Sequence, residues 1–188
     1  MAENMAERYR RWFEYEMDSH AKVLAAFKSV AASARQTEAF RKAVELAGHI
    51  VAARRLWLFR LGASKEAPTD FFPRGMTLPE LAGRFEGIHA AWSDYLARIS
   101  EDEITSFFEY RSTEEVRYRN TVEDILTQLH GHSLYHRGQI AMLLRSAGAE
   151  PPATDFVFWA REPIGRTRGV RRGGAHRVKK SGRRRRLS

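Results

Sequence analysis

The distribution of apolar residues along the chain predicts four long helices separated by breaks. In each of these segments apolar residues recur every three or four positions, which is the spacing that places them on one face of an α-helix. The four segments are residues 6–30, 36–61, 77–99 and 121–148. Helices of this kind are stable when they bury their apolar faces against one another, so the pattern predicts an all-α fold.

The ends of these helices also have sequence signals. Thr77-Leu-Pro-Glu80 is a capping box with proline in the first turn, and Thr121-Val-Glu-Asp124 is a second cap that begins with threonine. Gly62 and Gly148 follow the second and fourth segments, and glycine is common just beyond a helix C-terminus. These signals support the predicted boundaries.

The connecting segments contain further predicted structure. Residues 63–76 form a loop, and residues 107–119 alternate enough in character to form a short β-hairpin. Residues 155–159, Asp-Phe-Val-Phe-Trp, are too apolar to remain in solvent, so we expect them to fold back over an open end of the molecule. Four helices with short connections pack most simply as an antiparallel bundle.

Length and composition are those of one globular domain. The chain has 188 residues, of which 43% are hydrophobic, and it has no cysteine. Disulfides, thiolate metal sites and a cysteine nucleophile are therefore excluded. The charged N-terminal residues lack the apolar stretch of a signal peptide, and no apolar run approaches the length of a membrane span. We therefore expect a cytoplasmic protein.

The positive net charge of +9 is concentrated at the C-terminus. Residues 166–188 contain eleven Lys or Arg and no acid, which leaves 21 basic and 23 acidic residues, a net charge of −2, in residues 1–165. This predicts a folded body over residues 1–165 and a disordered basic tail over residues 166–188. The tail could contact nucleic acid non-specifically through counterion release, or it could be a solvated extension without a role.

The most specific chemical feature is a histidine pair in the fourth predicted helix. His132 and His136 are four residues apart, so they lie on one helical face, in line with the apolar residues Ile125, Leu129 and Ile140. We therefore expect both rings to point toward the core. Burial disfavours charged imidazole, and a shared divalent metal would explain two neighbouring neutral rings. The alternative is a pair of packed, hydrogen-bonded core histidines.

Other histidines differ in their surroundings. His130 lies about 160° around the helix from His132, so we expect it at the surface or in a second layer. His49 lies in the apolar stripe of the second predicted helix, where it could meet the pair. Three protein ligands would leave one coordination position for water or substrate, as in catalytic zinc sites. Glu45, one turn before His49, is a candidate general base or an ordinary solvated residue.

Two segments resemble the DinB-like (YfiT-like) family of metalloenzymes. They are His132-Ser-Leu-Tyr-His136-Arg-Gly-Gln-Ile140, and the stretch of residues 46–61 that contains His49; residues 154–158 are also similar to the end of family members. The resemblance covers residues 6–160. It implies an up-down-down-up four-helix bundle, often dimeric, with a divalent metal held by His49, His132 and His136. The family commonly has Asn where this chain has Gly131.

The resemblance leaves three hypotheses for function. The first is a metal-dependent enzyme that uses zinc or nickel and a low-molecular-weight thiol for S-transfer, with hydrolysis as the alternative reaction. The second is a metal- or ligand-binding protein without turnover. The third is a nucleic-acid-associated protein that uses the basic tail, with the bundle as a scaffold for a homodimer. Fold and motif alone do not decide between them.

Overall fold

The computed structural model describes residues 3–164. The predicted basic tail of residues 166–188, and with it the body–tail boundary at residue 165, lies outside the described residues. The described elements are α1 Met5–Ser29, the short 3₁₀ helix η1 Ala34–Gln36, α2 Glu38–Arg60, α3 Leu78–Arg98, α4 Glu101–Thr105, β1 Phe107–Arg111, β2 Arg117–Thr121, α5 Val122–Ser146 and α6 Phe156–Ala160.

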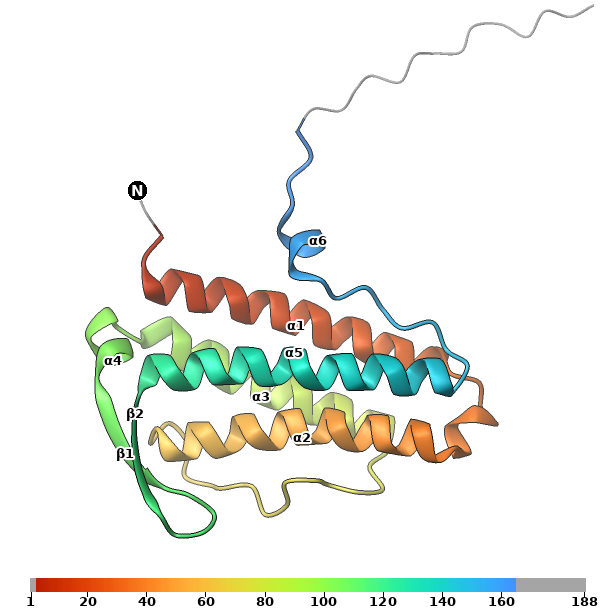
Figure 1. Ribbon diagram of the computed structural model, residues 1–188, viewed down its shortest axis with the longest axis horizontal. Helices are drawn as coiled ribbons and strands as arrows, with labels where there is room; N and C mark the ends of the chain where they lie inside the picture. Colours follow the sequence, from red (N-terminus) through yellow and green to blue (C-terminus); the bar gives the residue numbers. More distant parts are fainter. Residues whose placement is uncertain (1–2, 165–188) are drawn as a thin grey trace, which may run out of the picture.

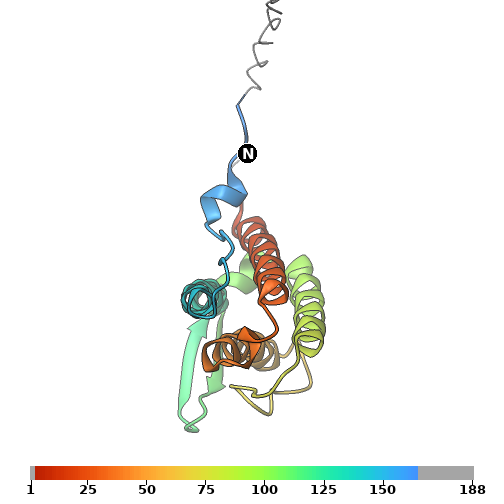
Figure 2. The ribbon, with the colours of Figure 1, turned by 90° about the vertical axis from the view of Figure 1, so that its right-hand side faces the viewer.

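The four long helices α1, α2, α3 and α5 form a bundle, as predicted (Figures 1 and 2). Helices α1 and α2 each pack against both α3 and α5, so α1 and α2 lie on one diagonal of the bundle. Figure 1 shows that α1 and α5 run in one direction and that α2 and α3 run in the other. This is the up-down-down-up arrangement that the family resemblance implies. The simple antiparallel bundle favoured by the residue pattern is wrong for two packed pairs, α2 with α3 and α1 with α5, because the helices of each pair run in the same direction.

The parallel arrangement of α2 and α3 requires a long connection. The loop of residues 61–77 returns along the length of the bundle beside α2 before α3 begins (Figure 1). Gly62 and Gly75 both have positive φ, of 72° and 68°, at which an L side chain would be strained. The loop therefore uses glycine where it leaves α2 and shortly before it enters α3.

Caps fix the beginnings of three long helices. The predicted boxes are present at Thr77 with Glu80 and at Thr121 with Asp124, where side chain and backbone satisfy each other reciprocally. A third box, formed by Asn4 and Glu7, begins α1. Each box pairs two backbone N–H groups that would otherwise have no partner within the helix.

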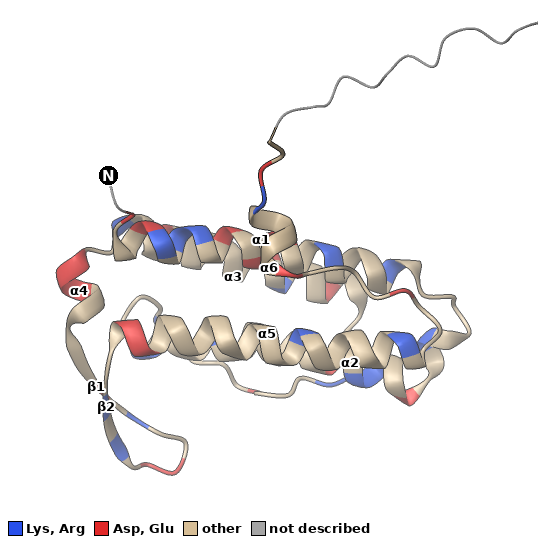
Figure 3. Ribbon diagram, turned by 45° about the horizontal axis from the view of Figure 1, so that its top comes forward, with Lys and Arg blue, Asp and Glu red and all other residues tan. Residues whose placement is uncertain are grey.

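The segments between α3 and α5 are partly as predicted. Strands β1 and β2 pair antiparallel, which confirms the hairpin, and Phe107 lies opposite Thr121. The short helix α4, whose first turn is acidic (Figure 3), was not predicted from the sequence.

Beyond α5, α6 does fold back, but it lies beside the middle of α1 and not over an open end of the bundle (Figure 1). Tyr15 anchors it there, through a ring contact with Phe156 and a 2.5 Å hydrogen bond to the carbonyl oxygen of Thr154.

Large side chains fill the centre of the bundle. Trp92, Phe27, Phe85 and Ile50 are almost completely buried and belong to one continuous apolar cluster. Burial of apolar area on this scale is the main source of folding free energy in a domain of this size. Within residues 3–164, no helix combines the length and the apolar character needed to cross a membrane.

Candidate metal centre

Three histidines from two helices converge on one point. His49 of α2 and His132 and His136 of α5 offer ring nitrogens that all lie within 4.8 Å of one another. The Nε2 atom of His132 is 3.1 Å from the Nε2 atom of His49 and 3.1 Å from that of His136. Helices α2 and α5 pack directly against each other, which brings the distant His49 to the pair. The structure therefore groups the three histidines that the sequence selected.

Hydrogen bonds at the other ring nitrogens orient two of these imidazoles. His49 Nδ1 lies 2.7 Å from the carbonyl oxygen of Phe71, and His136 Nδ1 lies 2.7 Å from Oε1 of Gln139. Because both oxygens accept hydrogen bonds, each Nδ1 is the nitrogen that donates. The Nε2 lone pairs of His49 and His136 then point at His132. Donation from the second nitrogen to a carbonyl or amide oxygen is typical of histidines that bind metals.

A divalent cation suits this donor set. A single proton on His132 Nε2 can bridge only one of the two 3.1 Å contacts, so two lone pairs face each other in the other contact. Tetrahedral coordination at about 2.0–2.1 Å from each nitrogen separates the ligand atoms by about 3.3 Å, close to the two 3.1 Å distances from His132 Nε2. Burial, with smaller effects of His136 and His49, lowers the pKa of His132 to about 4. Burial also lowers the pKa of His136. Neutral imidazole is the form that binds metal.

The cluster is accessible from solvent. All three imidazoles are partly buried. Phe72 stacks on His49 with ring centroids 4.1 Å apart, and the edge of Tyr135 contacts His136 at 5.1 Å. Phe72 and Tyr135 are 54% and 65% exposed, so two largely exposed aromatic rings lie against the cluster.

The prediction that the histidine pair lies on the core face of α5 is wrong. The buried line of that helix passes through Leu129, Ser133, Arg137 and Ile140, and the pair lies beside it on the flank that meets α2. Ser133 and Arg137 are buried because α1 and α2 supply polar partners for them. This flank position is the reason why the three rings are only partly buried.

Close approach of the 61–77 loop to α2 sets the orientation of His49. A Cβ atom added at Gly48 would lie 2.2 Å from Cε of Met76 and 2.9 Å from Cγ of Pro73. The absence of a side chain at this position lets the loop lie directly on the helix. The loop thereby brings the carbonyl oxygen of Phe71 to His49.

We expect Gly48→Val to weaken metal binding by about tenfold to a hundredfold, because the displaced loop withdraws the hydrogen-bond acceptor that orients His49. Competition with a fluorescent zinc chelator measures the change. Gly131→Val is the matched control, since Gly131 also directly precedes a ligand histidine but a Cβ there meets nothing within 4 Å. Equal affinities of the two variants would contradict this role of the loop.

Two residues considered from the sequence do not join the cluster. Glu45 is partly exposed one turn before His49 on α2, and it is not part of the group of candidate ligands. His130 points away from the cluster, as predicted. It is not a surface residue, however, because it stacks on Trp12 at 4.6 Å and its Nδ1 lies 3.1 Å from Oε1 of Glu16. His130 is therefore partly buried, and its ring faces α1.

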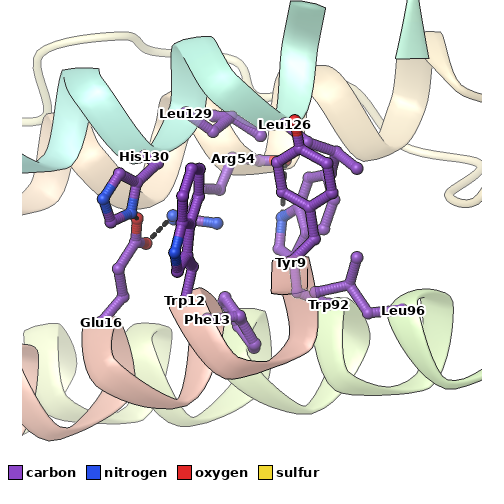
Figure 4. Close-up of a pocket in the computed structure, with 10 residues that line it drawn as sticks. All are labelled: Tyr9, Trp12, Phe13, Glu16, Arg54, Trp92, Leu96, Leu126, Leu129 and His130. Carbon is purple, nitrogen blue, oxygen red and sulfur yellow. Dashed lines mark hydrogen bonds and ion pairs between the residues drawn. The ribbon is translucent and has the colours of Figure 1, made fainter. Parts of the chain in front are cut away.

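A buried polar network lies on the other side of α5, and sequence reasoning missed it. Glu16 of α1 is 1% exposed and forms an ion pair with Arg54 of α2 (Figure 4). His130 and Ser133 also contact its carboxylate, at 3.1 and 3.4 Å. Aromatic side chains close around this group and leave a cavity of about 20 Å³, enough for one water molecule. The network links α1, α2 and α5, and α5 is also the helix that contributes the histidine pair.

A second histidine pair lies between α1 and α3. His20 Nδ1 is 3.1 Å from His89 Nε2, and the two rings stack. Burial, followed by the neighbouring His89, holds the pKa of His20 well below its usual range. Burial, followed by Arg54, lowers the pKa of His89 to about 4. Both rings are therefore neutral in the folded protein at neutral pH.

We expect this pair to make the protein sensitive to mild acid. Between the ordinary histidine pKa of 6.5 and about 4, the unfolded chain binds protons that the folded protein does not, so the free energy of unfolding falls as pH falls through this window. Thermal melting from neutral pH down to pH of about 4.5 measures the loss. His89→Gln keeps a hydrogen-bonding group but does not titrate, so its melting temperature should fall less steeply. Equal slopes would contradict the assignment.

Comparison with known proteins agrees with this architecture. A solved crystal structure of a DinB-like protein from Bacillus cereus ATCC 10987 is similar, with a TM-score of 0.64 and 22% sequence identity over 81% of this chain and 99% of that chain. At this identity the similarity shows the fold alone. No curated protein matches the sequence. The family match extends over residues 1–167, which includes the whole bundle and all three clustered histidines, and the chain therefore belongs to the DinB family.

Proposed function

We propose that the protein binds one divalent metal ion through His49, His132 and His136 and that it is a metal-dependent enzyme which transfers a low-molecular-weight thiol to an electrophilic substrate. One observation supports the metal site above all others. The Nε2 atoms of two imidazoles face that of His132 at 3.1 Å while their Nδ1 atoms are held by oxygen acceptors. Zinc and nickel are the ions that we favour, because both accept imidazole ligands.

The proposed chemistry requires a thiolate at neutral pH. A bound divalent ion supplies Lewis acidity, which lowers the pKa of a coordinated thiol. Three protein ligands leave a position for that sulfur. The thiol proton would pass to a base, and the sulfur would form a bond to the electrophilic carbon while the bond from that carbon to the leaving group breaks and the leaving group departs with the electron pair.

The residues around the cluster have defined parts in this proposal. His49 and His136 are held in one orientation by Phe71 and Gln139, so both imidazoles would be oriented to hold a metal ion before it binds. Phe72 and Tyr135 offer exposed aromatic surface for an apolar electrophile. Glu45 is the candidate acceptor of the thiol proton, and Glu45→Gln tests it by a lower rate at unchanged metal content.

The test is a conjugation assay on the purified full-length chain. Glutathione, mycothiol and bacillithiol are each offered with a chromogenic electrophile, before and after removal of metal by a chelator. We expect turnover with at least one thiol, loss of turnover on chelation, and recovery on addition of zinc or nickel. Chelator-sensitive hydrolysis of an aryl ester without thiol turnover would favour the hydrolase alternative. Bound metal without either reaction would favour a binding protein.

Assembly and location remain predictions from the sequence and the family resemblance. We propose a homodimer in the cytoplasm, with the basic tail as a non-specific contact for nucleic acid. Light scattering at micromolar concentration tests the dimer, since a monomer mass would refute it. Salt-dependent binding of DNA by the full-length chain tests the tail.

A further inference from the structure

A second hollow lies on the α2–α3 side of the bundle, beneath the 61–77 loop. Its volume is about 710 Å³, within the range of sites that bind small organic molecules. Its walls come from α2, from α3 and from the part of the loop that contains Pro68, Asp70 and Arg74. None of the three clustered histidines lines it. We call this hollow the loop groove.

The loop groove has accessible apolar side chains and two wall positions without a side chain. Pro68, Met76 and Ala91 line it and are partly or largely exposed, whereas Val51, Leu58 and Ile88 are at most 5% exposed. Gly83 and Gly87 face it from within α3, and a Cβ atom added at either one would meet nothing within 4 Å. Glycine inside a helix is destabilising relative to alanine, and packing of the protein itself does not require it at these two positions. Gly83 and Gly87 are exposed, so the groove is open along this part of α3.

The rim of the loop groove is positively charged. Three arginines, Arg55, Arg74 and Arg84, line it together with one acid, Asp70. Arg55 is 3.4 Å from Glu66 in an exposed ion pair, and the Asp70 carboxylate accepts a hydrogen bond from the backbone of its own loop. Within residues 3–164, Arg74 and Arg84 form no ion pair. Two guanidinium groups are thus available to a ligand, and guanidinium binds carboxylate and phosphate in bidentate geometry.

We propose that the loop groove binds a small organic anion that has an apolar body, with the apolar part on Pro68, Met76 and Ala91 and the carboxylate or phosphate on Arg74 and Arg84. A purely apolar ligand would not interact favourably with the two guanidinium groups, and an inorganic anion would bury none of the apolar side chains that line the groove. A ligand that contacts both the apolar side chains and the two arginines must therefore have an apolar part and an anionic group.

The loop groove and the metal centre share one loop. Phe71 and Phe72 contact His49 on one side, while Asp70, Pro73 and Arg74 line the groove on the other. The groove is nevertheless a separate site, since its ligand contacts would come from α2, α3 and this loop alone. Its occupancy can therefore be measured without reference to the reaction at the metal.

The test uses 8-anilinonaphthalene-1-sulfonate, an apolar anion whose fluorescence rises on binding. With the full-length chain we expect saturable binding, competition by octanoate and octyl phosphate, and no competition by 1-octanol. Comparison of octanoate with octyl phosphate distinguishes a carboxylate from a phosphate ligand. Equal competition by 1-octanol would overturn the proposal, because the rim would then contribute nothing.

Two variants locate the bound probe. Gly87→Leu fills the groove, and the double variant Arg74→Glu with Arg84→Glu reverses its charge; each should weaken probe binding by about tenfold or more. Gly131→Leu and the hairpin double variant Arg117→Glu with Arg119→Glu are the matched controls, and both should bind as the unaltered chain does. Circular dichroism establishes that each variant is folded. Unchanged binding by folded groove variants would overturn the proposal.

Discussion

Simultaneous replacement of His49, His132 and His136 by alanine should abolish metal binding, with an affinity loss of about a hundredfold or more. The expectation follows from the geometry, since these three rings are the candidate donors that converge on one point in the described chain. Elemental analysis of the purified variant, beside the unaltered protein, measures the loss. Each single variant should retain weakened binding, because two ligands remain in place. Thiol conjugation, where the unaltered chain shows it, should disappear together with the metal.

His130→Ala is the control for this experiment. His130 is on the same helix, two residues before His132, but its ring contacts Glu16 and Trp12 in the interior. We expect its replacement to lower the melting temperature and to leave the metal content intact. Near-stoichiometric metal in the triple variant would refute the site. Loss of metal from His130→Ala would show that the interior network, and not the three rings alone, determines binding.

Local signals were sufficient to predict the four long helices and the caps of α3 and α5. The boxes at Thr77 and Thr121 depend on side chains three residues apart, so they are visible in any short window of sequence. The parallel packing of α2 and α3 was not predictable from local signals. It depends on whether the 61–77 loop returns along the bundle, and the length of the loop permits α3 to run in either direction. The family resemblance, and not the residue pattern, supplied that part of the fold.

The sequence was sufficient to predict which histidines form the candidate site, but not how far their side chains are buried. His132 and His136 have the spacing of one helical face, and His49 occurs in an apolar stripe. Their partial exposure was missed because Ser133 and Arg137 take the central positions on α5. A polar residue is buried when other helices supply its partners, and no pattern within one helix reveals them. The same reason explains why Glu16 and Arg54 went unnoticed.

Replacement of Glu16 by alanine should cost about 3–5 kcal/mol of the free energy of unfolding, the usual cost of removing one partner of a buried ion pair. Among the buried polar residues that the structure describes, Glu16 is the one acid, and Arg54 and Arg137 are buried cations nearby. Burial, followed by the charge of Arg137, lowers the pKa of Arg54 to about 9. Without the carboxylate, both guanidinium groups would lie in the interior with no opposing charge.

Chemical denaturation of Glu16→Ala, Glu16→Gln and Glu14→Ala separates this effect from ordinary substitution. Glu14 is on the same helix but exposed, so its loss should change stability by no more than about 0.5 kcal/mol. Glu16→Gln keeps the shape and one acceptor oxygen for Ser133 and Arg54 but has no charge, and it should fall between the other two. If Glu16→Gln is as stable as the unaltered chain, hydrogen bonding and not charge is what the buried carboxylate contributes. If Glu16→Ala is also unaffected, the arginines must find other partners, and the network does not hold α1, α2 and α5 together.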